Sequence, residues 1–238
     1  YRSDKVAVKG SYYNTQWKDR NLTKSVTTGQ GDSGDTDIIY LTGVNQSHTG
    51  VEVEAKVALH EMVDVDFAFS KGDWKFDGDA KGDYLEQEYN EDGQIIGQMT
   101  TEYVYALNNL KVGDMPQTAY VGGLTLKPIK GLNIQGLLKV YDDNYADWSP
   151  ESREVTGDED RAQVWKAPGY NKLDLHLSYK LPEIAGLDLT LHGHVFNALD
   201  NVYVQDATDN SKYNGFGDKL HLAHNAEVFL GTPRYYNI

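Results

Sequence analysis

The chain has 238 residues and a formal net charge of −14, which is enough length for one large β domain or two small ones. Binding to a phosphate backbone depends on Lys and Arg that neutralise phosphates, so this acidity argues against a nucleic-acid partner. The sequence has no cysteine, which excludes a disulfide framework and a thiolate metal site. No apolar run approaches the roughly 20 residues that a membrane helix needs.

Apolar and polar residues alternate with a period of two along most of the chain, whereas helical periodicity is almost nowhere sustained. The alternation begins almost at the first residue, which is Tyr1 and not Met, so we expect a piece of a longer polypeptide. The expected strands cover, in chain order, about 6–17, 38–59, 63–76, 120–126, 132–140, 173–181, 187–195 and 226–238.

The stretch VEVEAKVALHEMVDVDFAF (51–69) shows the alternation most clearly. Two strands joined at His60-Glu61-Met62 would have one wholly apolar face and one charged face. A soluble β-sandwich would pack the apolar face against a second sheet, whereas a membrane barrel would turn it outward to lipid.

The predicted connections alternate in length, which favours the membrane barrel. Short connections fall at 60–62, 128–131 and 182–186, and long ones at 20–37, 77–117, 142–166 and 206–225, with a hairpin expected around Asn90–Gln94. Short turns at one end and long loops at the other are typical of outer-membrane barrels, and the apolar stripes have the 9–11 residue length of a membrane strand. Tyr and Trp near the stripe ends (Tyr141, Tyr145, Trp148, Trp165 and Tyr170) fit interfacial girdles.

Five stretches follow one another in a particular order and spacing over nearly the whole chain. They are TGVNQSHTGVEVEAKV (42–57), KVGDMPQTAYVGGLTLKPIKGL (111–132), VYDDNYADW (140–148), VFNALDNVYVQDA (195–207) and FLGTPRYYNI (229–238). Together they resemble the C-terminal barrel region of TonB-dependent outer-membrane receptors, particularly those of Bacteroidetes-type bacteria. The fourth stretch departs from the family's V-x-N-L-F-D-x-x-Y pattern, with Ala198-Leu199 in place of Leu-Phe.

The resemblance implies an all-β fold, an antiparallel transmembrane β-barrel of roughly 22 strands with a plugged lumen. Residues 1–238 would supply about the last eight strands, without an internal domain boundary and without the plug domain. A small closed eight-stranded barrel remains an alternative, although its narrow lumen would be crowded by charges.

For function, the resemblance implies a receptor of the bacterial outer membrane that imports a scarce nutrient, such as an iron–siderophore, vitamin, peptide or oligosaccharide. Its partners would be TonB and the plug domain, both engaged through parts outside this sequence, together with outer-membrane lipid, the ligand and a surface lipoprotein. No cofactor and no enzymatic activity are expected, and no G-x-S-x-G or H-E-x-x-H signature is present. A soluble or surface glycan-binding sandwich and a small barrel hydrolase are the alternatives.

The charged face of the strands is expected to line the lumen. Its members are Glu52, Glu54, Lys56, Asp64, Asp66, His176, His192 and His194. With the last short turn centred near Ile184, His176 is expected opposite His192, with His194 two residues further along. Three imidazoles on one face could bind a transition metal or sense pH, or could simply hydrogen-bond in a wet interior.

Aromatic residues in or beside the long connections are candidates for stacking on a ligand. They are Trp74, Tyr84, Tyr89, Trp148, Trp165 and Tyr213. The same residues could instead serve as girdle or loop packing. Acidic loops at 31–37, 77–83 and 141–147 offer oxygen ligands of the kind that Ca²⁺ prefers, or are solvated turns.

Overall fold

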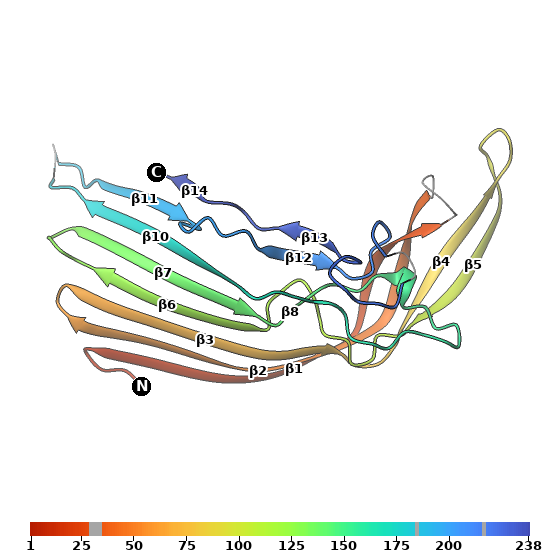
Figure 1. The fold of residues 1–238 in the computed structure, drawn as a ribbon, viewed down its shortest axis with the longest axis horizontal. Coiled ribbons are helices and arrows are strands. Elements are labelled where there is room, and N and C mark those ends of the chain that lie inside the picture. The colour runs from red at the N-terminus through yellow and green to blue at the C-terminus, as the bar shows by residue number, and fades with distance from the viewer. Residues whose placement is uncertain (29–34, 184–185, 216–217) are drawn as a thin grey trace.

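The computed structural model describes residues 1–28, 35–183, 186–215 and 218–238, and these form β-strands with one short 3₁₀ turn (Figure 1). In these ranges no helix is long and apolar enough to cross a membrane. The elements are β1 (Val6–Thr28), β2 (Asp35–His60), β3 (Val63–Phe76), β4 (Ala80–Tyr89), β5 (Ile95–Tyr105), β6 (Thr118–Leu126), β7 (Leu132–Asp142), β8 (Asn144–Tyr145), η1 (Pro150–Ser152), β9 (Lys166–Ala167), β10 (Tyr170–Lys180), β11 (Thr190–Phe196), β12 (Val204–Thr208), β13 (Glu227–Leu230) and β14 (Tyr235–Asn237).

Eight strands lie side by side in the order β1-β2-β3-β6-β7-β10-β11-β14, each antiparallel to its neighbour. The β4–β5 hairpin extends this sheet from the far half of β2, where Leu41 pairs with Gly82. The all-β, antiparallel fold is therefore confirmed. The expected strand at 226–238 is wrong in part, because Glu227–Leu230 (β13) pairs with β12 in a separate two-stranded sheet and only Tyr235–Asn237 (β14) joins the main sheet. The expected long loop at 20–37 is wrong in part, because β1 and β2 continue to pair as far as Thr28 and Asp35.

The short connections lie at one end of the sheet, as predicted. The turn between β2 and β3 holds only Glu61 and Met62, and the Met62 backbone N–H donates to His60 Nδ1. The turn between β6 and β7 ends at Gly131, whose φ of 85° suits a residue without a Cβ. Figure 1 shows both turns at the left, opposite the long connections at the right.

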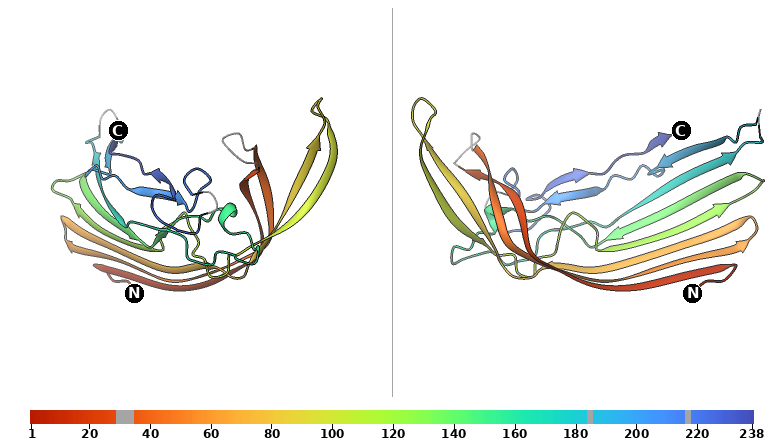
Figure 2. Two further views of the ribbon diagram at one scale, coloured as in Figure 1. Left: turned by 45° about the vertical axis from the view of Figure 1, so that its right-hand side comes forward. Right: turned by 180° about the vertical axis from the view of Figure 1, so that it is seen from behind.

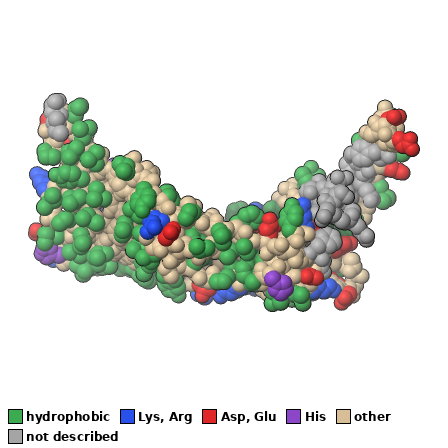
Figure 3. All heavy atoms as spheres, turned by 45° about the horizontal axis from the view of Figure 1, so that its top comes forward, with side chains coloured by type: hydrophobic (Ala, Val, Ile, Leu, Met, Phe, Trp, Pro, Cys, Tyr) green, Lys and Arg blue, Asp and Glu red, His purple; other side chains and the backbone are tan. Residues whose placement is uncertain are grey.

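One face of the eight-stranded sheet is apolar and exposed. The register places the apolar positions of adjacent strands directly opposite one another, for example Val53 with Phe69 and Leu126 with Ile134. The exposed members are Val8, Tyr12, Val51, Val53, Phe67, Tyr120, Leu124, Leu126, Ile134, Leu138, Val140, Leu175, Leu177, Leu191 and Tyr236. Figure 3 shows hydrophobic side chains gathered over the strand region at the left of the view.

A row of charged groups bounds this apolar face on the side of the long connections. The rings of Phe69 and Tyr120 lie 5.0 Å apart at its edge, and Lys71 follows two residues after Phe69. Asp143 accepts hydrogen bonds from Lys166 (2.7 Å), Thr118 (2.5 Å) and Lys71 (3.3 Å), and these donors hold the pKa of its carboxyl well below the usual range. An aromatic row followed by paired charges is the arrangement expected where a lipid-facing surface meets water.

The opposite face is polar and lies on the concave side of the sheet (Figure 2). Gln46 pairs with Phe76 and shares a face with the even-numbered residues of β2 and β3, including Glu54 and Asp66. Phe76 belongs to a buried core formed by the long connections, so this is the face over which they fold. The core contains Ile39, Leu41, Val44, Phe76, Ala80, Tyr105, Leu107, Leu110, Trp148 and Val164.

Neither the soluble β-sandwich nor the closed eight-stranded barrel describes this arrangement. In a sandwich the apolar face would be the buried one, whereas here its residues remain exposed and the polar face carries the covering segments. In a closed eight-stranded barrel β1 would pair with β14, and the described strands do not form that pair. Barrel closure and the expected strand total of about 22 stay predictions.

The matched pair Val53 and Glu54 tests the two faces. A charge at Val53 would sit on the apolar face and is expected to destabilise membrane assembly by about 2–4 kcal/mol near the bilayer midplane, whereas the same charge at Glu54 would sit on the polar face. We expect Val53→Arg to reduce the amount of heat-modifiable protein in the membrane fraction strongly and Glu54→Arg to reduce it far less. Equal tolerance of both substitutions would contradict the assignment of the faces.

Candidate ligand-contacting face and the loop hub

An aromatic platform lies on the concave face near the long connections. The indole of Trp74 (β3) stacks on His48 (β2) with centroids 5.6 Å apart and an interplanar angle of 16°. Trp74 Nε1 donates to the phenol oxygen of Tyr13 (β1) at 2.8 Å, so three adjacent strands contribute one connected surface. We define Tyr13, His48 and Trp74 as the platform.

Two glycines explain why the platform rings can lie flat. A Cβ at Gly50 would stand 2.3 Å from the Tyr13 hydroxyl oxygen, and one at Gly72 would stand 2.4 Å from Trp74 Nε1. Any other residue at these strand positions would therefore lift a ring off the sheet. Glycine inside a strand often marks such a close approach.

The side chains of Gln117 and Gln46 hold the platform in place through hydrogen bonds. Buried Gln117 accepts from the Trp74 backbone N–H at 3.0 Å and donates to the Trp74 carbonyl at 2.9 Å. Gln46 Oε1 accepts from Arg20 Nη1 at 2.8 Å and lies 3.3 Å from His48 Nε2. The platform is thus preorganised, with a guanidinium close to its His48 end, and is suited to stacking on a planar or sugar-like group.

The charged residues expected to line the lumen all lie on the concave face. Several are already paired: Asp64 with Lys127 (2.6 Å), Asp66 with Lys56 (3.6 Å) and Glu52 with the Ser11 hydroxyl (3.1 Å). Glu54 is exposed on the same face. Their exposure to a lumen remains a proposal.

The expected pairing of His176 with His192 is wrong. The register pairs His176 with His194, and His192 faces Ser178, because the two strands pair two residues further along β11 than expected. All three imidazoles still share the concave face, since the shift moves the partner by two residues. No group of three or more His, Asp or Glu within the described ranges is arranged to hold a metal ion.

The loop aromatics divide into three groups. Trp148 is 1 % exposed in the loop core, where it packs on Tyr105, so it offers no surface to a ligand and that expectation is wrong. Trp165 is half-buried and Tyr213 is 71 % exposed. Tyr84 and Tyr89 lie on β4, but their side chains fall outside the described part of the structure.

Tyr141 and Tyr170 do not form a lipid-facing girdle. Their rings pack 5.0 Å apart on the concave face, and Tyr170 stacks on buried Tyr203 at 4.4 Å. Lys172 lies over the Tyr203 ring at 5.2 Å. The expected lipid-facing girdle is wrong for Tyr141 and Tyr170 because both residues lie on the polar face of the sheet. Phe69 and Tyr120 lie on the apolar face.

Within the described residues, carboxylates of the acidic loops form ion pairs with Lys and Arg of the same chain. Asp79 forms a bidentate pair with Arg161 (2.9 and 3.1 Å), Asp142 accepts from Lys166 (3.0 Å), and Asp147 is paired with Lys24. Residues 31–34 of the first acidic loop lie outside the described residues. Ion pairing accounts for these carboxylates without Ca²⁺.

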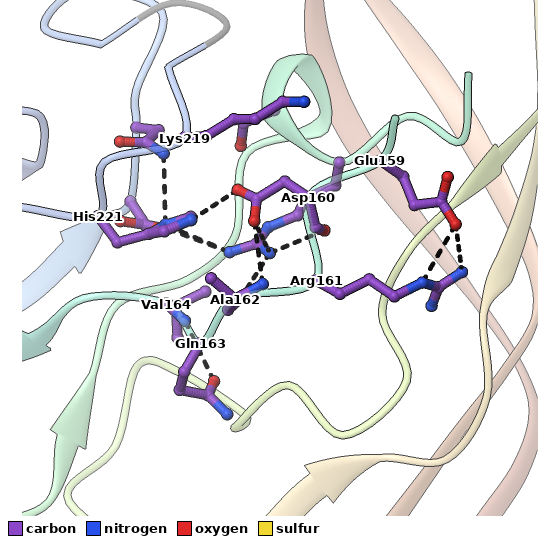
Figure 4. A network of polar contacts seen from close by, with 12 residues as sticks. Glu159, Asp160, Arg161, Ala162, Gln163, Val164, Lys219 and His221 are labelled. Carbon is purple, nitrogen blue, oxygen red and sulfur yellow. Dashed lines mark hydrogen bonds and ion pairs between the residues drawn. The ribbon is translucent and has the colours of Figure 1, made fainter. Parts of the chain in front are cut away.

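A buried charge cluster joins two of the long connections (Figure 4). Arg153 and Asp209 are fully buried, and Arg153 Nη2 lies 3.4 Å from Asp209 Oδ2. His221 lies between two carboxylates, with Nδ1 2.5 Å from Asp209 Oδ2 and Nε2 2.6 Å from Asp160 Oδ2. We name Arg153, Asp160, Asp209 and His221 the loop hub.

The loop hub is electrically balanced when His221 is protonated. Burial lowers the pKa of His221, but the hydrogen bond and charge of Asp209 and the charge of Asp160 outweigh it, so the pKa is raised. Two cations then face two carboxylates, and the Arg153 guanidinium also donates to the backbone oxygens of Asp160 (3.1 Å) and Ala162 (2.7 Å). The hub fixes 149–165 against 206–225 and hence the covering of the concave face.

Neither the loop hub nor the Tyr13 and His48 part of the platform is expected from sequence alone. The hub residues are spread over 69 positions, from Arg153 to His221, with no periodic pattern to connect them. For the platform the sequence contains one indication of a close approach: Gly50 and Gly72 interrupt two otherwise alternating strands.

No protein-family model matches the chain, and no curated protein matches it. Among solved structures, the copper transporter OprC matches with a TM-score of 0.56 and 18% identity, covering 99% of this chain and 28% of that chain. The ferric-catecholate import receptor Fiu from E. coli K12 aligns in its closed and open forms with TM-scores of 0.36 and 0.34 and 11% identity, covering 98% of this chain and 42% and 38% of those chains.

The chain spans less than half the length of the structures that it matches. At 18% identity the likeness to OprC concerns the fold alone: the strands are arranged as in part of that structure.

The loop hub predicts a specific response to substitution and to pH. His221→Gln removes the charged donor shared by Asp160 and Asp209, and breaking a buried charge network costs about 3–5 kcal/mol. In the unmutated protein the raised pKa means that the His221 contribution is complete below about pH 6.5 and is lost as pH rises through the folded pKa.

Hydrogen exchange across 149–165 and 206–225, corrected for intrinsic rates, measures both effects. We expect faster exchange in His221→Gln at pH 6, and a difference between variant and unmutated protein that shrinks at alkaline pH. His224→Gln, at an exposed histidine three residues away, is the matched control. A His221→Gln profile identical to that of the control would contradict the hub.

Proposed function

We propose that the chain forms barrel wall and external loops of a TonB-dependent transporter that imports a scarce nutrient across a bacterial outer membrane. The observation that carries the proposal is the two-faced sheet: eight antiparallel strands with an exposed apolar convex face, a polar concave face, and all long connections at one end. The OprC-like fold supports it.

In this proposal the apolar face contacts outer-membrane lipid and the polar face lines the lumen against a plug domain. TonB and the plug domain act through parts of the protein beyond these residues, and a surface lipoprotein is a further candidate partner. The C-terminal position of this chain within a barrel of about 22 strands belongs to the same proposal. A nutrient too large for simple diffusion needs energy, which in such receptors is delivered by contact with TonB.

The platform is our candidate for first contact with the nutrient. It faces the concave side close to the loop core, where a ligand held by the loops would enter. Its neighbouring Arg20 suits a ligand with a carboxylate or phosphate group. The imported class, whether iron–siderophore, vitamin, peptide or oligosaccharide, is to be decided by experiment.

Uptake by cells tests the proposal. A deletion strain should grow more slowly on one limiting nutrient among these four classes, and removal of TonB should cause the same defect. Uptake that persists without TonB, or a protein recovered in the soluble fraction, would contradict the proposal.

Neighbouring tyrosines give a matched test of the platform. Tyr13→Phe removes the acceptor of the Trp74 indole N–H, whereas Tyr12→Phe changes an exposed residue on the opposite face. Because aromatic contacts contribute about 0.5–1.5 kcal/mol, we expect Trp74→Ala to raise the half-saturating nutrient concentration about 2- to 10-fold and Tyr13→Phe to have a smaller effect in the same direction. Tyr12→Phe should leave it unchanged at equal protein abundance. Transport unaffected by Trp74→Ala would remove the platform from the proposal.

A further inference from the structure

The β4–β5 hairpin has an edge that no strand of the eight-stranded sheet covers in the described part of the chain. β4 pairs with β2 only at Lys81, Gly82 and Asp83, and β5 pairs with β4 along Ile95–Tyr105. Figures 1 and 2 show the hairpin projecting beyond the end of the sheet. We define the outer edge as the side of β5 that faces away from β4.

A short segment of the chain already pairs with the base of the outer edge. The Val155 backbone N–H donates to the Val104 carbonyl oxygen at 2.8 Å, and the Ala106 N–H donates to the Arg153 carbonyl oxygen at 2.8 Å. These two bonds flank an antiparallel bridge to β5. The outer edge therefore accepts a further strand at the one place where this chain supplies it.

The same two hydrogen bonds fix which residues of β5 direct their backbone groups outward. Successive residues of a strand direct these groups to opposite sides, and the register of β5 with β4 is continuous from Gln98 to Tyr105. Because Val104 uses the outer edge, Glu102, Thr100 and Gln98 use it as well. Among the described residues, no backbone partner meets these three on that edge.

The outer edge lacks the usual protection between residues 95 and 101. Natural sheets blunt an exposed edge with charged residues or proline, which prevents a further strand from pairing there. Residues 95–101 include no charged residue and no proline, and Ile95, Ile96 and Met99 are exposed. An incoming strand would gain both main-chain hydrogen bonds and apolar contacts.

The charge of the hairpin selects the kind of strand that can be added. Residues 80–105 contain six acidic residues and one Lys. Asp83 lies directly opposite Glu102, and Lys81 binds Glu102 at 2.9 Å. Like charges opposite one another destabilise a strand pair, and a second copy of the hairpin would add the same excess of negative charge. A Lys or Arg opposite Glu102 would offset that charge.

We propose that the outer edge, from Gln98 to Glu102, binds an extended basic segment of a partner protein as an added β-strand. Main-chain hydrogen bonds to Gln98, Thr100 and Glu102 hold the segment, and cationic side chains on one of its faces lie beside Asp83 and Glu102. Because the hairpin projects beyond the sheet that carries the platform, the occupant is a partner protein and not the imported nutrient. The inference goes beyond nutrient import and does not rest on it.

A synthetic strand tests the site on the whole encoded polypeptide, purified in detergent. The probe is a peptide of about ten residues in which Thr and Lys alternate, so that its Lys side chains share one face. We expect it to bind and to slow hydrogen exchange within 95–103. The same peptide N-methylated at every residue keeps its charge but has no backbone donors, so it should bind at least about tenfold more weakly. A peptide of alternating Thr and Glu should not bind.

Thr100→Pro and Thr100→Ala form a matched pair of variants. Proline removes the outward N–H of residue 100 and places its ring on the outer edge, and it is tolerated because that N–H does not pair with β4. We expect Thr100→Pro to weaken binding of the Thr-Lys probe at least about tenfold and Thr100→Ala to leave it unchanged.

Hydrogen exchange of the unmutated protein decides the question even if Thr100→Pro disturbs the hairpin. Unchanged exchange within 95–103, or equal binding of the N-methylated probe, would overturn the proposal. It would also be overturned by slow exchange at Gln98, Thr100 and Glu102 before the probe is added, because another part of the polypeptide would then cover the edge. TonB-dependent uptake of the probe by cells, or a dimer lost in Thr100→Pro, would give the edge to the nutrient or to a second copy and would overturn it too.

Discussion

The structure depends on one constraint: the pleat of a β-strand sends successive side chains to opposite faces, and here the two faces are made for different surroundings. Val53 and Glu54 are adjacent in sequence, yet one belongs to the exposed apolar face and the other to the polar concave face. A slip of one residue in any of the eight strands would exchange the surfaces along its whole length. The continuity of the apolar face across the sheet therefore fixes the register.

The long connections obey a different constraint. They bury a compact core around Trp148 on the polar side of the sheet and are joined by the loop hub, in which Arg153 and Asp209 have no contact with solvent. Buried charges of this kind are costly unless each is paired, and His221 provides the pairing between two connections. The hub thus sets how the loops cover the concave face, while the platform remains beside them on the strands.

Much of the fold could be predicted from sequence because a period of two is a local signal. The strands, the short turns and the polar face that carries Asp66 were all predictable in this way. Features that depend on exact strand register or on distant contacts were not: a register shift of two residues changed the partner of His176 to His194, and burial removed Trp148 from the ligand candidates. The platform depends on Tyr13 reaching over a glycine of the next strand, which composition alone does not indicate.

The absence of cysteine allows the central claim to be measured directly, because single cysteines can be introduced one at a time from 51 to 57 and spin-labelled in a lipid bilayer. The account predicts that accessibility to oxygen, which concentrates in lipid, peaks at 51, 53, 55 and 57. Accessibility to a water-soluble nickel chelate should peak at 52, 54 and 56, out of phase with oxygen. Equal exposure of both sets to the nickel chelate would contradict a lipid-facing sheet.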